Sequence, residues 1–73
     1  MTVQNFSTDP LTMVFEPSAE EVELAPHAMI RVTWPGEQGA EIAWRPDLIQ
    51  IGSPPGGGLR AWDSDGDEIP GLP

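Results

Sequence analysis

The sequence predicts a small all-β protein, either an antiparallel β-sandwich or a partly open barrel of five to six short strands. Nine prolines and eight glycines interrupt the 73 residues every few positions, which leaves little room for helices. Between these interruptions apolar and polar residues alternate in short runs, the pattern of half-buried strands. Regularly spaced turns are typical of sandwiches and barrels, whereas a parallel α/β fold needs crossover helices for which the chain has no room.

The chain is expected to have a flexible N-terminal arm, residues 1–10, followed by a single small domain, residues 11–73. Ser18 and Glu21 have the spacing of a capping box, which allows one short helical turn there. The strands expected on either side of that turn are Leu11–Glu16 and Val22–Leu24.

The middle of the chain predicts a β-hairpin. Residues 29–34 (MIRVTW) alternate, with Ile30, Val32 and Trp34 on one face. Residues 40–45 (AEIAWR) alternate in the same way, with Ala40, Ile42 and Trp44 on one face, and the Gly-containing stretch PGEQG separates the two runs. Two alternating runs joined by a short Gly-containing loop are typical of a hairpin.

The C-terminal part predicts two further strands and a tight turn. Asp65-Gly66 favours a type I′ turn, and the Asp63 carboxylate is placed to accept hydrogen bonds from the amides of that turn. In chain order the expected elements are a turn at 45–47, a strand at Leu48–Ile51 with Ile49 and Ile51 inward, a loop at 52–58, a strand at Leu59–Trp62, and a brief return pairing by Glu68 and Ile69.

The charge of the chain is strongly acidic. Twelve acidic residues face three arginines and no lysine, so the formal net charge is −9. Such a surface repels phosphate backbones and anionic membranes, which argues against direct nucleic-acid or membrane binding. It keeps a small β protein soluble, and it suits a basic protein partner.

The sequence also disfavours disulfide-bonded, zinc-thiolate, secreted and membrane-spanning proteins. There is no cysteine for a disulfide or a zinc-thiolate site. The first residues have no basic and apolar leader, and no stretch approaches the roughly 20 apolar residues of a membrane span. A cytoplasmic protein, or one assembled in a virion, is the expectation.

WDSDGDEI (residues 62–69) is the one stretch that resembles a known chemical device, a calcium loop. Asp63, Asp65 and Asp67 alternate as calcium ligands do. An EF-hand loop, however, needs glycine at its sixth position and a glutamate at its twelfth, and Glu68 occupies the sixth position here. The stretch therefore predicts an acidic turn, with weak, millimolar divalent-cation binding as the alternative and no cofactor.

Nothing in the sequence favours an enzyme. His27 is the only histidine and follows Pro26, as a turn residue does, and the serines lie at chain interruptions rather than beside a base. The loop GSPPGGG lacks the lysine of a phosphate loop.

Protein contact is the remaining expectation. Trp62 shares a strand face with Arg60, so either Leu59 and Ala61 point inward and Trp62 is exposed, or Trp62 is a core residue. An exposed Trp62 beside an arginine would be a contact hot spot. The polar arm and exposed strand edges are further contact elements. The contact residues expected are Phe6, Arg60, Trp62, Glu20 and Glu21.

The order of ELAP, two alternating strands and WDSDGDEI resembles small uncharacterised all-β acidic proteins of high-GC bacteria or their phages. The resemblance spans residues 11–70, and it implies the fold without any functional residue. We expect a non-catalytic protein-interaction module, such as an accessory or decoration subunit of a phage particle or other assembly. The alternatives are a charge-driven inhibitor or immunity-type protein that blocks a basic nucleic-acid-binding site, and the weak divalent-cation binder.

Overall fold

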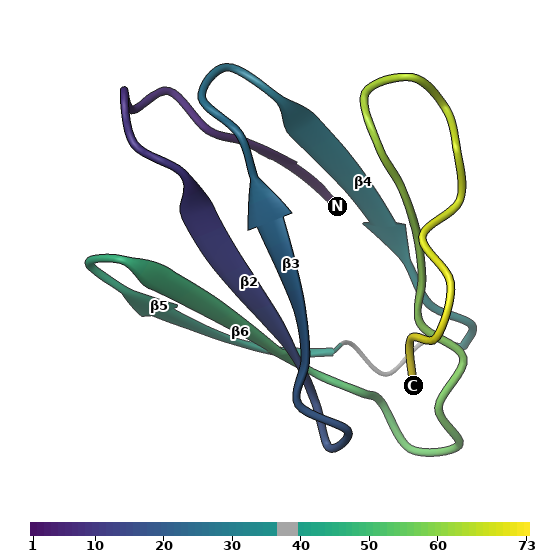
Figure 1. Ribbon diagram of the computed structural model, residues 1–73. Helices are drawn as coiled ribbons and strands as arrows, with labels where there is room; N and C mark the ends of the chain where they lie inside the picture. Colours follow the sequence, from purple (N-terminus) through teal and green to yellow (C-terminus); the bar gives the residue numbers. More distant parts are fainter. Residues whose placement is uncertain (37–39) are drawn as a thin grey trace.

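The computed structural model describes residues 1–36 and 40–73, and in these ranges it contains strands and no helix (Figure 1). This confirms the all-β prediction, with seven strands in place of five or six. Within the described ranges, no helix has the length and apolarity that crossing a membrane requires. The strands are β1 (Thr2–Gln4), β2 (Leu11–Glu16), β3 (Glu20–Leu24), β4 (Met29–Thr33), β5 (Glu41–Arg45), β6 (Leu48–Gly52) and β7 (Arg60–Trp62).

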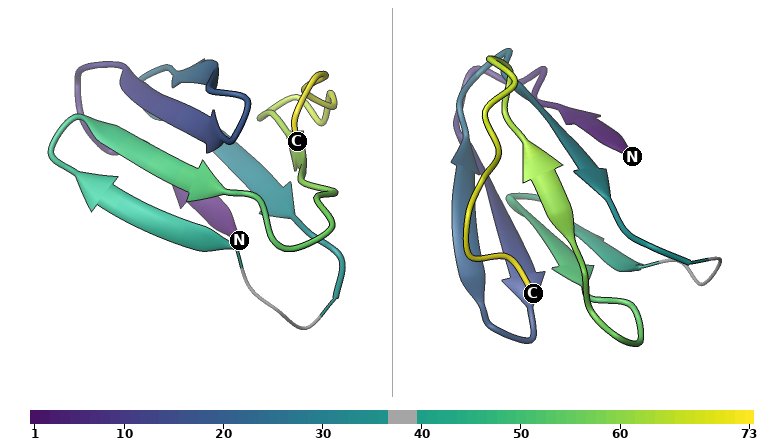
Figure 2. Two further views of the ribbon diagram at one scale, coloured as in Figure 1. Left: turned by 90° about the horizontal axis from the view of Figure 1, so that it is seen from below. Right: turned by 90° about the vertical axis from the view of Figure 1, so that its right-hand side faces the viewer.

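The strands form two sheets that face each other. One sheet has three strands in the order β1-β4-β7, and the other has four in the order β3-β2-β6-β5 (Figure 2). Strands β5 and β6 are joined by the short turn at Pro46 and Asp47, as expected from the sequence.

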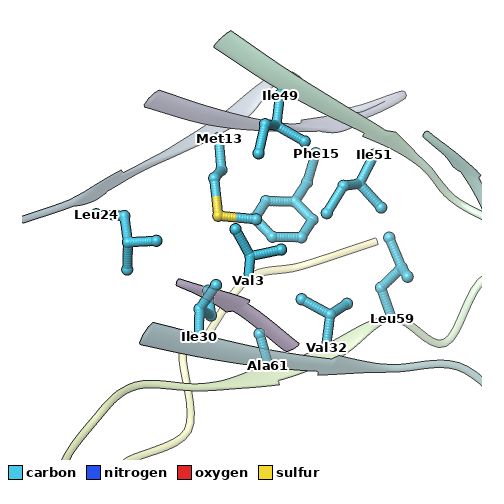
Figure 3. Packing of buried hydrophobic residues seen from close by; sticks show 10 residues of the cluster. All are labelled: Val3, Met13, Phe15, Leu24, Ile30, Val32, Ile49, Ile51, Leu59 and Ala61. Carbon is cyan, nitrogen blue, oxygen red and sulfur yellow. The ribbon is translucent and has the colours of Figure 1, made fainter. Parts of the chain in front are cut away.

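The apolar core lies between the two sheets. In Figure 3, Met13, Phe15 and Ile49 of the four-stranded sheet point toward Val3 and Ile30 of the other sheet. The inward placement predicted for Ile30, Val32, Ile49 and Ile51 is confirmed, because alternate residues of a strand share a face. The buried members of the core are Val3, Met13, Phe15, Leu24, Ile30, Val32, Ile49, Ile51, Leu59 and Ala61.

The hairpin predicted from residues 29–34 and 40–45 is wrong, although both runs form strands. Strand β4 pairs with β1 and β7, whereas β5 pairs with β6 in the other sheet. The chain therefore passes from one sheet to the other between these runs, and the expected turn lies partly outside the described residues, at 37–39. The alternating pattern fixes which face of a strand is buried, but it does not fix which strand lies beside it.

The expectation of a wholly antiparallel sheet is also corrected. Strands β2 and β6 are parallel, with Met13 opposite Ile49 and Phe15 opposite Ile51. Parallel neighbours need a long crossover connection, which is usually a helix. Here the connection between them contains β3, β4 and β5 instead.

The first five residues belong to the fold rather than to an arm outside it. Strand β1 pairs with β4, and Val3 is buried opposite Ile30. The amino group of Met1 donates to the carbonyl of Val32 at 2.8 Å, and the backbone amide of Val32 donates to the carbonyl of Met1 at 2.7 Å. The separate domain boundary at residue 11 is corrected accordingly, because β1 supplies one border of the three-stranded sheet.

The connections around β3 differ in detail from the expectation. Residues 17–19 form a turn without a helical segment, and β3 begins at Glu20, two residues before the predicted start. His27 lies in a turn, as predicted, with a positive φ of 66°.

Candidate protein-binding site

A groove opens where the two sheets meet beside β3. The loop after β7 forms its third side, because the chain turns at residues 63–67 and returns along β7. The groove measures about 230 Å³, below the roughly 300–1,000 Å³ typical of small-molecule sites. Its lining residues are Val22, Glu23, Leu24, Ala25, Ala28, Met29, Ile30, Asp63, Ser64, Asp65 and Ile69.

The floor of the groove is apolar. Leu24 and Ile30 are buried members of the core, and Val22 and Ile69 pack against that core while remaining partly accessible. Met29 also lines the groove, but it alternates along β4 with the inward Ile30 and Val32, so its side chain, 43% exposed, lies on the outer face of the three-stranded sheet. A flexible thioether suits such a position, because methionine adapts to irregular apolar surfaces.

The rim of the groove is acidic. Glu23 stands on β3, and Asp63 and Asp65 stand on the loop across from it. Among the described residues, those that line the groove include no arginine or histidine. The groove thus combines an apolar floor with a rim of one charge sign, which suits a ligand that is both apolar and cationic.

The loop that carries two of these acids is held by its own hydrogen bonds. Asp63 Oδ1 accepts from the backbone amides of Asp65 at 2.9 Å and Asp67 at 3.0 Å, as the sequence predicts. The type I′ turn is wrong, because Gly66 alone has positive φ there. The amide of Gly66 donates to the carbonyl of Asp63, and the amide of Asp63 donates to the carbonyl of Asp67. This is the pattern of a type I turn followed by a glycine bulge.

Ser64 fastens the same loop to the start of β4. Its hydroxyl accepts from the Met29 amide at 2.9 Å and donates to the Met29 carbonyl at 3.1 Å. The predicted return pairing is confirmed as well, with a bridge between Trp62 and Glu68 and a hydrogen bond from the Ile69 amide to the Ala61 carbonyl. The rim of the groove therefore has a fixed position relative to its floor.

The three aspartates of this loop gather at its exposed side. One carboxylate oxygen from each of Asp63, Asp65 and Asp67 lies within 4.8 Å of the others. One oxygen of Asp63 already binds two amides of the turn, so the arrangement serves the turn itself. Calcium takes six to eight oxygen ligands. The loop therefore matches an acidic turn, and millimolar cation binding stays a prediction.

The structure separates most of the predicted contact residues. Phe6 is 79% exposed in the loop after β1. Glu20 and Glu21 are exposed at the beginning of β3, whereas the loop that holds Phe6 leads to Leu11, which pairs with Leu24 at the other end of β3. Apart from the sequence neighbours Glu20 and Glu21, only Arg60 and Trp62 of the predicted contact residues lie together.

Arg60 and Trp62 belong to a cluster on the outer face of the three-stranded sheet. The guanidinium carbon of Arg31 lies 4.4 Å from the centre of the Trp62 ring, and that of Arg60 lies 5.0 Å from it. Arg31 is directly opposite Trp62 in the pairing of β4 with β7, which explains the first contact. Leu59 and Ala61 take the inward positions, so Trp62 is half-buried under the arginines rather than a core residue.

Glu68 completes this cluster. Its two carboxylate oxygens accept from Arg60 Nε at 2.9 Å and Arg60 Nη2 at 2.8 Å. These hydrogen bonds hold the pKa of the Glu68 carboxyl below its ordinary value and raise the pKa of Arg60. The pair is well exposed, so it fixes the orientation of Arg60 more than it stabilises the fold.

Several hydroxyl groups and the histidine lie in turns or loops of the described parts of the chain, whereas the buried Ser53 Oγ has no hydrogen-bond partner there. Ser7 Oγ bonds to the backbone of Asp9, Ser64 Oγ bonds to Met29, and His27 is an exposed turn residue. A second hollow of about 470 Å³ lies over β5 and β6, with Glu16, Glu41 and Gln50 as its polar lining. In the first hollow, the Ser64 hydroxyl bonds to the backbone of Met29, and Asp63 and Asp65 are its sequence neighbours.

Sequence reasoning missed Met29 and Ser64 as parts of the candidate site. Met29 begins an alternating strand and Ser64 lies in a turn, so neither has a local signal that identifies its partner. They meet because β4 and β7 are neighbours, a pairing between distant segments. The comparisons with family models, curated proteins and solved structures give no match for this chain.

Proposed function

We propose that this protein is a non-catalytic, acidic protein-interaction module with a small β-sandwich fold, and that it acts as an accessory subunit of a larger assembly. The observation that carries the proposal is the groove beside β3, with its apolar floor and acidic rim. Its small volume favours a side chain or short segment of another protein over a drug-sized ligand.

The chemistry of the groove defines the partner. An aliphatic side chain would cover Val22 and Ile69 on the floor. Lysine or arginine residues flanking it would meet Glu23, Asp63 and Asp65 on the rim. The net charge of −9 would also speed the approach of a basic partner. The expected ligand is therefore a basic protein segment that contains an exposed aliphatic residue.

A charge-driven inhibitor is the second candidate, because β3 extends the acidic surface beyond the groove. Glu20, Glu21 and Glu23 are all exposed along that strand. An inhibitor would use them to occupy a basic nucleic-acid-binding site of its target. Its affinity should fall steeply with salt, whereas an assembly contact dominated by apolar burial should change little.

A direct test uses a synthetic peptide with one leucine flanked by arginines, titrated into the isotopically labelled protein. We expect chemical-shift changes at Val22, Ala28, Met29 and Ile69, with an affinity in the micromolar to millimolar range. The same titration with lysine and arginine alone, without leucine, should bind more weakly, because the floor is then left uncovered. Shift changes spread over the surface without a maximum at the groove would contradict the proposal.

Matched charge variants locate the contact. Glu23→Gln combined with Asp65→Asn removes two rim charges, and we expect the peptide to bind about tenfold more weakly. Glu20→Gln combined with Asp47→Asn removes the same charge away from the groove and should change the affinity far less. Equal weakening by both pairs would show that net charge alone drives binding, which favours the inhibitor.

A further inference from the structure

Each sheet has two border strands, and these four strands differ in how much of their outer edge is open to pairing. The outer side of β7 is covered, because Glu68 and Ile69 pair back along it. Strand β1 offers only three residues, Thr2–Gln4. The two longer borders, β3 and β5, both belong to the four-stranded sheet and have five residues each.

The β3 border is protected by charge. If two copies of β3 paired antiparallel about Val22, Glu21 of each copy would lie opposite Glu23 of the other. Directly opposed like charges destabilise a strand pair. Acidic side chains on an edge strand are a common way to prevent such pairing.

The β5 border has the opposite property, because its sequence is complementary to itself. Strand β5 reads EIAWR, from Glu41 to Arg45. In an antiparallel pair centred on Ala43, Glu41 of one copy faces Arg45 of the other, and Ile42 faces Trp44. Both kinds of pair, opposite charges and aromatic with β-branched, are the favourable cross-strand pairs.

We propose that two copies of this chain associate through β5 in this register, as a twofold symmetric dimer. Among the described residues, no strand lies on the outer side of β5, so its edge amides and carbonyls have no strand partner there. A symmetric contact uses the same surface on both copies, which is what a self-complementary strand supplies. The two four-stranded sheets then form one continuous sheet across the interface.

The exposure of Trp44 is the second observation in favour of the dimer. Trp44 lies opposite Ile49 and Ile42 lies opposite Ile51, so both face the same side as the core. Ile42 packs against the core, yet Trp44 is 66% exposed on that apolar face. The three-stranded sheet is narrower than the four-stranded sheet that it faces. We infer that it does not extend over the part of β5 that carries Trp44. Ile42 of a second copy would cover the Trp44 ring.

The opposite face of β5 fits the same arrangement. Glu41 and Arg45 are both exposed there, with the small residue Ala43 between them. At the centre of the interface Ala43 faces its own copy, so no bulky side chains collide. The pair of Glu41 with Arg45 occurs twice by symmetry, and it opposes the general repulsion between two acidic molecules.

A charge exchange tests the dimer. Sedimentation equilibrium of the whole chain at about 0.15 M salt, where the Debye length is about 8 Å, is compared from micromolar to millimolar protein. We expect a concentration-dependent dimer for the natural sequence. Glu41→Arg alone and Arg45→Glu alone each place like charges opposite one another and should weaken dimerisation at least about tenfold. The double variant, with both changes, should restore the dimer because the pairs are only reversed.

The control is Glu21→Arg on the β3 border, a matched reversal of charge that should leave the β5 dimer intact. If a single variant fails to fold, amide hydrogen exchange of the natural protein decides instead, since protection of residues 41–45 should rise with concentration. A natural protein that stays monomeric at millimolar concentration would overturn the proposal. So would a dimer that all three β5 charge variants leave unchanged.

This interface lies apart from the groove beside β3, at the other border of the four-stranded sheet. The two proposals therefore fail separately. Peptide binding in the groove should persist in the Glu41→Arg variant, and dimerisation should persist when Glu23 and Asp65 are neutralised.

Discussion

Asn5 shows how much of this small fold depends on one polar side chain. Among the residues that the structure describes, Asn5 is the polar residue that is buried, with 4% of its surface exposed. Its side-chain amide donates to the carbonyls of Asp9 at 2.8 Å and Leu24 at 3.0 Å, and its side-chain oxygen accepts from the Ser7 amide at 2.9 Å. Asn5 thus joins the loop after β1 to the end of β3, beside the groove.

Asn5→Ala should lower the free energy of unfolding by about 2 kcal/mol, because it leaves the buried carbonyl of Leu24 without its donor. Asn5→Asp should cost more, since a carboxylate oxygen would then face two carbonyl oxygens. Urea denaturation measures both, and Gln4→Ala at an exposed position of β1 is the control. An Ala variant as stable as the natural protein would show that water replaces these hydrogen bonds without cost.

The Arg60 and Glu68 pair predicts a local pH dependence. Because the pKa of Glu68 is lowered in the folded protein, the pair is complete above the ordinary glutamate pKa and is lost as pH falls through the lowered folded pKa. A carbon NMR titration of the Glu68 carboxyl should show this lowered midpoint, accompanied by shifts of the Trp62 ring. Arg60→Gln should return the midpoint to the ordinary range. An unchanged midpoint in that variant would assign the lowered pKa to another cause.

At the scale of elements, the alternation of apolar residues predicted the strands better than it predicted their neighbours. Residues 29–34 and 40–45 form strands, with Ile30 and Val32 inward, yet the two strands lie in different sheets. Alternation reports which face is buried, whereas neighbours are chosen by packing between distant segments. The same limit explains the parallel pairing of β2 with β6, because nothing in either strand identifies the other.

Strand β1 illustrates a related limit, and it leads to a prediction. The polar composition of residues 1–10 indicated an arm, but β1 contributes Val3 to the core opposite Ile30. Val3→Ala removes two buried methyl groups and should destabilise the fold by about 1–2 kcal/mol at roughly 0.8 kcal/mol per carbon. Thermal unfolding followed by circular dichroism measures the change. An arm outside the fold would give no loss, and Thr2→Ala on the exposed face provides the comparison.

The candidate site was predictable in part. The turn at residues 63–67 and the role of the Asp63 carboxylate as its acceptor follow from local chemistry, and the structure confirms them. The groove was not predictable, because its floor and rim come from β3, β4 and the loop after β7, which meet only in the folded chain. Trp44 was placed on the correct face, but its exposure depends on the number of strands in the facing sheet.

At the scale of the whole molecule, charge repulsion should set the response of stability to salt. The net charge of −9 is confined to a molecule with a radius of gyration of 11.6 Å. Within the described ranges, a single ion pair, Arg60 with Glu68, offers attraction that salt would weaken. Screening should therefore remove more repulsion than attraction, and added salt should stabilise the folded state.

We expect the midpoint of thermal unfolding to rise by roughly 5 °C between low salt and about 0.5 M sodium chloride, equivalent to about 1 kcal/mol for a chain of this size. The combined variant Glu20→Gln, Glu21→Gln and Glu23→Gln removes neighbouring charges from β3. It should be more stable than the natural protein at low salt and should respond less to added salt. Scanning calorimetry of both proteins at several salt concentrations provides the measurement. A midpoint that stays constant or falls with salt would show that the acids are too far apart to repel, and the acidic surface would then act on partners without a cost to the fold.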